Sequence, residues 1–196
     1  MEETIKRRNA EIVVFSSVNV DVYLENEDNL IMRIDNNTGF NYKYTRVVVA
    51  KEFRLIFIGK GFKKTAYVTV DSQGRVEYNL NSILTQEEMI NAYDREAALA
   101  QLHRKPTGYT FEQLSEVGEL EDLVILRKFL NEISSDNYLV ALCAQAVSEI
   151  TMRNKEKLER SFIEAVKAEV LCRYENYAAK RSYGYMIEQA LRRLSV

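Results

Sequence analysis

Apolar residues recur at every second position over the first part of the chain and at every third or fourth position afterwards. A period of two is typical of strands with one buried face, and a period near 3.6 is typical of amphipathic helices. The first pattern extends from Glu11 to Leu80 and is interrupted by short polar turns. It predicts an antiparallel β-meander of about six strands, forming a small barrel or a strongly curved sheet, because closure removes exposed edges.

Some strands can be characterised further. One apolar face is predicted to run without interruption from Ile12 to Leu24. In the segment Phe40–Ala50, the apolar face changes from the tyrosines at 42 and 44 to the valines at 47 and 49, which predicts a β-bulge or a sharp bend. The segment Phe53–Ile58 is apolar on both faces and is predicted to be a central strand.

The helical pattern begins at Thr85. Thr85 and Glu88 have the spacing of a capping box, in which each side chain bonds the backbone amide of the other residue. One helix is predicted from there to a point before Pro106, the only proline in the chain, since proline ends a helix. The segment 105–109 is the best candidate for a linker.

Further helices are predicted beyond this segment. Thr110 and Gln113 repeat the capping-box spacing, and Gly118 is predicted to end the short helix that they begin. From Asp136 to Tyr183 the chain has neither glycine nor proline, which predicts one long helix or two stacked helices, with a break at 153–157. Strands first and helices afterwards indicate the α+β class, with a β domain at 1–84 and a helical domain or subdomain at 85–196.

Composition narrows the class of protein. The 196 residues are 46% hydrophobic and 29% charged, which is typical of a globular chain. No apolar run approaches the roughly 20 residues of a membrane span, and the start of the chain lacks the apolar segment of a signal peptide. The two cysteines, Cys143 and Cys172, predict mostly buried free thiols and specify no disulfide framework. We therefore expect a cytoplasmic protein, or at least one in a reducing intracellular compartment, without membrane contact.

Charge varies along the chain. Residues 1–84 carry 12 basic and 11 acidic side chains, residues 85–152 carry 5 and 12, and residues 153–196 carry 10 and 6. An acidic middle and a basic end attract each other, within one molecule or between copies.

The residues offer little catalytic chemistry. Histidine occurs once, at His103, beside two cations near a predicted helix end, which favours an exposed helix-terminal residue over a catalytic one. The acids Glu119, Glu121 and Asp122 open a predicted helix, where the helix dipole favours them without any catalytic role. We expect no catalytic residue, no metal site and no cofactor.

Two clusters point to binding. The first is the predicted hairpin tip Gly59–Lys64, which carries Lys60, Lys63, Lys64 and an exposed Phe62 next to strands with Tyr42, Tyr44 and Tyr67. Lysines bind phosphates and aromatic rings stack on bases, so this hairpin is a candidate single-stranded nucleic-acid site. The simpler interpretation is a solvated turn with the strand aromatics in the core.

The second cluster is the basic, tyrosine-rich end of the chain. Its candidate partner-binding residues are Arg173, Tyr174, Tyr177, Arg181, Tyr185, Arg192 and Arg193. Tyrosine and arginine are enriched in protein interfaces, and the acidic middle of the same chain is an alternative partner for these cations.

The favoured hypothesis is a non-catalytic interaction or assembly subunit that binds itself or another protein through its helical half. One alternative is a single-stranded nucleic-acid-binding protein that uses the hairpin and the basic tail. A component of a viral particle or of another large assembly also fits the composition.

Overall fold

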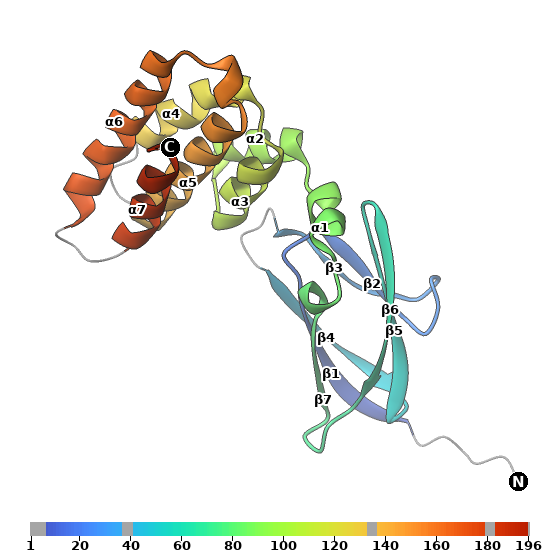
Figure 1. The fold of residues 1–196 in the computed structure, drawn as a ribbon. Coiled ribbons are helices and arrows are strands. Elements are labelled where there is room, and N and C mark those ends of the chain that lie inside the picture. The colour runs from blue at the N-terminus through green and yellow to red at the C-terminus, as the bar shows by residue number, and fades with distance from the viewer. Residues whose placement is uncertain (1–6, 37–40, 133–136, 179–182, 196) are drawn as a thin grey trace, which may run out of the picture. The chain divides into compact units, whose positions relative to one another are not determined.

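The computed structural model of the chain describes residues 7–36, 41–132, 137–178 and 183–195, with the side chains of 176–178 excepted. The chain divides into two compact units, Met1–Tyr93 and Asp94–Val196 (Figure 1). Strands make up most of the first unit and helices make up the second. The predicted α+β class is therefore confirmed.

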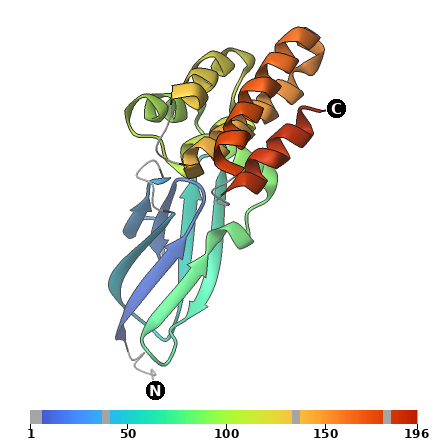
Figure 2. The same ribbon diagram turned by 90° about the vertical axis from the view of Figure 1, so that its left-hand side faces the viewer.

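The first unit contains two sheets. Its strands are β1 (Arg8–Phe15), β2 (Val20–Leu24), β3 (Leu30–Ile34), β4 (Tyr42–Val49), β5 (Glu52–Gly59), β6 (Phe62–Thr69) and β7 (Arg75–Asn79). The three-stranded sheet has the order β4-β1-β7, and the four-stranded sheet has the order β3-β2-β5-β6 (Figures 1 and 2). The strand β5 lies between β2 and β6, as its two apolar faces predicted.

The core of this unit lies between the two sheets. Phe57 of β5 stacks on Tyr78 of β7, with ring centroids 5.1 Å apart and planes 18° from parallel. Ile12 and Val14 of β1 and Leu55 of β5 are fully buried. Burial also raises the pKa of the Tyr78 phenol, because desolvation disfavours its charged form.

Three expectations about the strands were wrong. The face predicted to run from Ile12 to Leu24 belongs to two strands in different sheets, separated by a corner at Ser16–Asn19. The register of β4 against β1 is continuous, and among the described strand pairs the one register shift lies between Val22 and Tyr23 of β2. The first strand also pairs with β7 in parallel, which no meander contains.

The corner between β1 and β2 has its own hydrogen bonds. The Ser16 hydroxyl donates to the carbonyl of Val18 at 2.7 Å, and the Ser17 amide and hydroxyl both donate to Asn81 Oδ1, at 2.8 and 2.9 Å. These bonds satisfy polar groups of Ser16 and Ser17, which lie next to the buried Val18. The corner is thus fixed to η2 (Leu80–Ser82), the turn that follows β7.

The first unit ends with a short helix, α1 (Gln86–Ala92). Its capping box is confirmed: the Glu88 amide donates to Thr85 Oγ1 at 3.1 Å and the Thr85 amide donates to Glu88 Oε2 at 2.9 Å. The helix predicted to continue toward Pro106 is instead two helices, because Asp94 begins α2 (Arg95–Arg104) by accepting a bond from the Ala97 amide.

The second unit is helical. After α2 come α3 (Gly108–Val117), η3 (Leu120–Asp122), α4 (Leu123–Glu132), α5 (Asn137–Arg153), η4 (Lys155–Lys157), α6 (Arg160–Ala178) and α7 (Gly184–Arg193). The break predicted at 153–157 is confirmed, as is the helix end at Gly118. Of the predicted linker at 105–109, only residues 105–107 connect α2 to α3, and 108–109 form the first residues of α3; the whole segment lies inside this unit.

The capping box predicted at Thr110 and Gln113 was wrong. The helix α3 begins earlier, after Thr107, whose amide donates to Thr110 Oγ1 at 3.0 Å. Gln113 is buried, and its Oε1 accepts a hydrogen bond from the Asp94 amide at 2.9 Å. Gln113 therefore anchors the start of α2 rather than the start of α3.

Two arginines connect helices of the second unit. Arg95 of α2 forms a bidentate pair with the buried Asp122 of η3, with both N···O distances at 2.8 Å. Arg127 of α4 forms another with Glu169 of α6, at 2.9 and 2.6 Å, and its guanidinium lies 4.7 Å from the centroid of the Phe162 ring. Such charge-assisted forks fix the position of one helix against another.

Candidate functional site

The three lysines of the β5–β6 hairpin each bind a different acceptor within the chain. Lys60 Nζ donates to the Tyr93 carbonyl at 3.2 Å, Lys63 pairs with Glu27, and Lys64 pairs with Glu88 at 2.7 Å. The Glu88 pKa lies below its usual range because of the bond from Lys64 and then the bond from the Thr85 amide. The hairpin therefore holds α1 against the sheet and does not present three converging cations.

The prediction that Phe62 is exposed was wrong. Its side chain is 7% exposed, because the turn consists only of Lys60 and Gly61 and places Phe62 directly opposite Gly59. The Phe62 ring covers the position of a side chain at Gly59, where a Cβ would lie 2.3 Å from the ring. Gly61 has a φ of +81°, which glycine adopts without strain. An aromatic ring at this site has no face free for stacking on a base.

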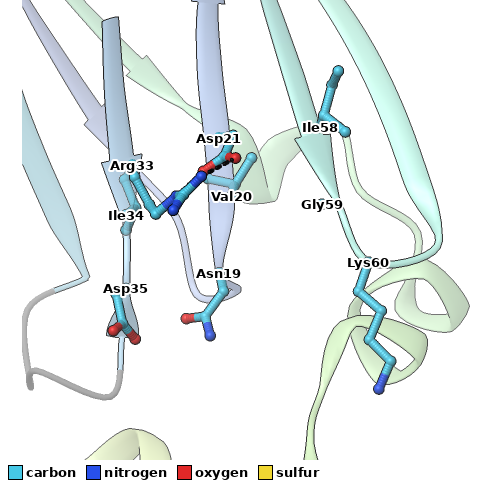
Figure 3. Close-up of a pocket in the computed structure, with 9 residues that line it drawn as sticks. All are labelled: Asn19, Val20, Asp21, Arg33, Ile34, Asp35, Ile58, Gly59 and Lys60. Atoms are coloured by element: carbon cyan, nitrogen blue, oxygen red, sulfur yellow. Dashed lines mark hydrogen bonds and ion pairs between the residues drawn. The ribbon is translucent and has the colours of Figure 1, made fainter. Parts of the chain in front are cut away.

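A pocket of about 440 Å³ lies next to this hairpin, at the ends of β2, β3 and β5 (Figure 3). Arg33 forms a bidentate pair with Asp21 across it, at 2.6 and 2.8 Å, while the Lys60 side chain extends away from that pair (Figure 3). Asp35, the remaining charged residue of the lining, also has an interaction within the chain. Because its charges are already paired, the pocket offers a ligand little electrostatic attraction.

The basic residues near the end of the chain bind partners in their own unit. Arg193 pairs with Glu149 of α5 at 2.9 Å, Arg192 pairs with Glu188 at 2.6 Å, and Arg173 donates to the Asn131 carbonyl. Arg193 thus binds the acidic middle of the chain, which is the internal alternative that the charge pattern left open, and connects α7 to α5. Arg173 connects α6 to the end of α4, whereas the Arg192 pair is exposed and lies within α7.

The tyrosines of this segment differ in exposure. Tyr174 is half-buried against the helical core, and Tyr185 is exposed. Arg181 and the side chain of Tyr177 lie outside the described residues. Of the predicted partner-binding set, Tyr185 therefore presents the most apolar surface to solvent among those that the structure describes.

Among the described residues of the first unit, a group of exposed aromatic and apolar side chains lies on the outward face of the three-stranded sheet. Tyr42, Tyr44 and Val48 of β4 are 46%, 63% and 56% exposed. The Phe15 ring of β1 lies 5.7 Å from the Tyr42 ring. We call these four residues the tyrosine face. The simpler interpretation, in which the strand tyrosines lie in the core, was wrong for Tyr42, Tyr44 and Tyr67.

The strand register explains this exposure. Side chains alternate between the two faces of a strand, so Tyr42, Tyr44, Arg46 and Val48 point one way and Val47 and Val49 point the other. Because no bulge interrupts β4, this alternation holds along its whole length. Tyr67 is also exposed, but it belongs to β6 in the other sheet and does not join the tyrosine face.

The charges beside the tyrosine face balance. Arg46 pairs with Glu11 at 3.3 Å, and Arg75 pairs with Glu77 at 2.7 Å and lies 3.8 Å from Glu11. Two guanidinium groups and two carboxylates thus form an alternating row across β4, β1 and β7. A surface of this kind suits a protein better than a polyanion, since nucleic-acid affinity depends on an excess of cations.

The sequence contained a signal for this face. Arg46 lies an even number of positions from Tyr42 and Tyr44, so it shares their face of an uninterrupted strand. An unpaired arginine is rare on a buried strand face. The predicted change of face in β4 concealed this signal, because it assigned the tyrosines and the valines of one strand to the same side. Phe15 and Val48 were not singled out at all, since an isolated apolar residue on a strand is ordinary.

The two cysteines differ in burial, which the sequence did not predict. Cys143 is buried and Cys172 is exposed, and neither forms a disulfide, so the prediction of mostly buried thiols holds for Cys143 alone. Burial raises the pKa of the Cys143 thiol far above its usual range, which makes it a poor nucleophile. His103 is exposed in the last turn of α2, as predicted.

Among the described residues, no group of three or more His, Cys, Asp or Glu side chains is arranged to hold a metal ion. No helix in the described part of the chain has the length and apolar character needed to cross a membrane.

Neither family models nor curated proteins nor solved structures provide a match for this chain.

Proposed function

We propose that the protein is a non-catalytic interaction subunit that binds a protein partner through the tyrosine face. The observation that carries this proposal is the exposure of Tyr42, Tyr44 and Val48 side by side on one strand, with the Phe15 ring beside them. Tyrosine is enriched among the residues that dominate binding energy in protein interfaces. The proposal keeps the interaction role predicted from the sequence and assigns it to the β unit.

The balance of charges supports a protein over a nucleic acid as the partner. Lys60, Lys63 and Lys64 are engaged within the first unit, and Arg46 and Arg75 lie beside carboxylates. A nucleic-acid site would need cations whose counterions are released on binding.

The test places a photo-reactive benzoylphenylalanine at position 44 or, as the matched control, at position 67. Both positions are exposed tyrosines on strands of the first unit, in different sheets. Irradiation of the full-length protein in its native cells is expected to give a discrete protein adduct from position 44 only. Equal adducts from both positions, or none from position 44, would overturn the proposal. An adduct that nuclease removes would instead support nucleic-acid binding.

A further inference from the structure

We propose that Arg46 selects the partner of the tyrosine face by pairing with a carboxylate that the partner holds between apolar side chains. The inference rests on the proposed function and states the chemistry of the partner. An aspartate or glutamate of another protein would lie over Arg46, and the apolar side chains on both sides of it would cover Tyr44 and Val48.

Arg46 lies among the apolar residues of β4. Its side chain shares one face of the strand with Tyr44 and Val48, its neighbours two positions away, at about 6.5–7 Å along the strand. On the adjacent strand, Val13 lies opposite Tyr44 and is buried. A partner that packs on this surface would therefore remove water from around the Arg46 guanidinium.

Arg46 is only weakly paired within the chain. Its side chain is 80% exposed, and among the described residues its guanidinium contacts one oxygen of Glu11, at 3.3 and 3.4 Å. Hydrogen bonds between a guanidinium and a carboxylate are usually about 2.7–2.9 Å long. A guanidinium has five N–H donors, so most of those on Arg46 remain available for a second carboxylate.

The other arginine of this face is held more tightly. Arg75 on β7 binds Glu77 at 2.7 Å and also lies 3.8 Å from Glu11. When Arg46 turns to a partner, Glu11 keeps Arg75 beside it, so no carboxylate of the face loses its only cation. Arg46 can thus change its contact at little cost, whereas Arg75 already has a short ion pair of its own.

Covering the face would make the choice of partner selective. A charged pair is stronger where water is excluded, and a covered guanidinium without an anion is unfavourable. The face therefore favours a partner with one carboxylate at this point over a partner with an apolar or basic residue there. A phosphate group is less suited, because its greater negative charge would lie near both Glu11 and Glu77.

The experiment measures the photo-adduct from position 44 of the full-length protein after one further substitution. Arg46→Gln removes the charge with little change in size, and Arg75→Gln is the matched control on the same face of the sheet. Both arginines form exposed pairs, which contribute little to stability, so both variants are expected to keep the wild-type urea midpoint. The adduct yield is expected to fall about tenfold or more with Arg46→Gln and less than about threefold with Arg75→Gln.

A charge exchange tests the carboxylate directly. Mass spectrometry of the adduct is expected to place the link within a few residues of an aspartate or glutamate of the partner. Replacing that acid by lysine is expected to remove the adduct when position 46 is arginine and to restore it with Arg46→Glu.

Equal yields from wild type and Arg46→Gln, an equal loss with Arg75→Gln, or no recovery after the charge exchange would overturn the role of Arg46 and leave the proposed function standing. Loss of the adduct after phosphatase treatment of permeabilised cells would assign a phosphate in place of the carboxylate and would also overturn the inference. The absence of any protein adduct from position 44 with Arg46 and Arg75 unchanged would overturn both proposals.

Discussion

At the scale of single residues, the cations of the first unit act mainly as structural anchors. Lys60 binds the last carbonyl before the second unit, and Lys64 binds the capping residue Glu88. The helix α1 is short, and an isolated helix of that length is unstable in water. These lysine contacts, together with the capping box, therefore stabilise α1 on the hairpin.

The Lys64–Glu88 contact predicts a pH dependence of stability. The folded-state pKa of Glu88 is lowered, so its contribution is present above the unfolded glutamate pKa of about 4.3 and is lost as pH falls through the lowered folded value. Glu88→Gln keeps a capping side chain but removes the charge. We expect a lower urea midpoint for this variant at pH 7 and a difference from wild type that vanishes in acid.

The matched control is Glu87→Gln, which removes an exposed carboxylate from the same helical turn. Both substitutions change the interaction with the helix dipole, but only one removes the partner of Lys64. A pH-dependent loss of equal size in the two variants would contradict the assignment to Lys64.

At the scale of elements, the spacing of apolar residues and the capping patterns predicted most strands and helices. They did not predict which strands pair or in which register. The break at Ser16–Asn19 was hidden because Val18 is buried and keeps the alternation in phase across the corner. The parallel partner of β1 depends on β7, far along the chain, and no local pattern reports such a pairing. The exposure of Tyr42 and Tyr44 was also missed, because it depends on the continuous register of β4 against β1.

The fork between Arg127 and Glu169 gives a prediction about the α4–α6 contact. Arg127→Lys keeps the charge but loses the two parallel hydrogen bonds and the planar contact with Phe162. We expect a loss of about 1 kcal/mol in the free energy of unfolding, measured in urea. Lys128→Ala, which removes an exposed pair with Glu132 on the same helix, is expected to cost less than about 0.5 kcal/mol. Equal losses would contradict a specific role for the fork.

At the scale of the whole molecule, the chain has two separate hydrophobic cores. One lies between the sheets around Phe57, and the other surrounds α5 with Leu126 and Cys143 among its members. A core side chain in either unit therefore contributes mainly to the stability of its own unit. The tyrosine face belongs to the first unit alone, so its exposure does not depend on the helical core.

The two cores predict a division in hydrogen exchange. Leu126→Ala creates a cavity in the helical core and is expected to cost about 2–5 kcal/mol there, while amides of β1 and β5 keep their protection. Leu55→Ala, the reciprocal variant in the first unit, is expected to show the opposite pattern. If either variant lowered protection equally across both units, the chain would unfold as one cooperative unit.

The position of β1 in its sheet has a consequence for protein synthesis. This strand leaves the ribosome first of the seven, yet its neighbours β4 and β7 follow much later in the chain. Its apolar residues therefore have no partner strand at first, and its sheet is complete only when Asn79 has emerged. Pairing across such a long sequence separation is slow, so the apolar residues of β1 stay without partner strands on the nascent chain until both neighbours have emerged.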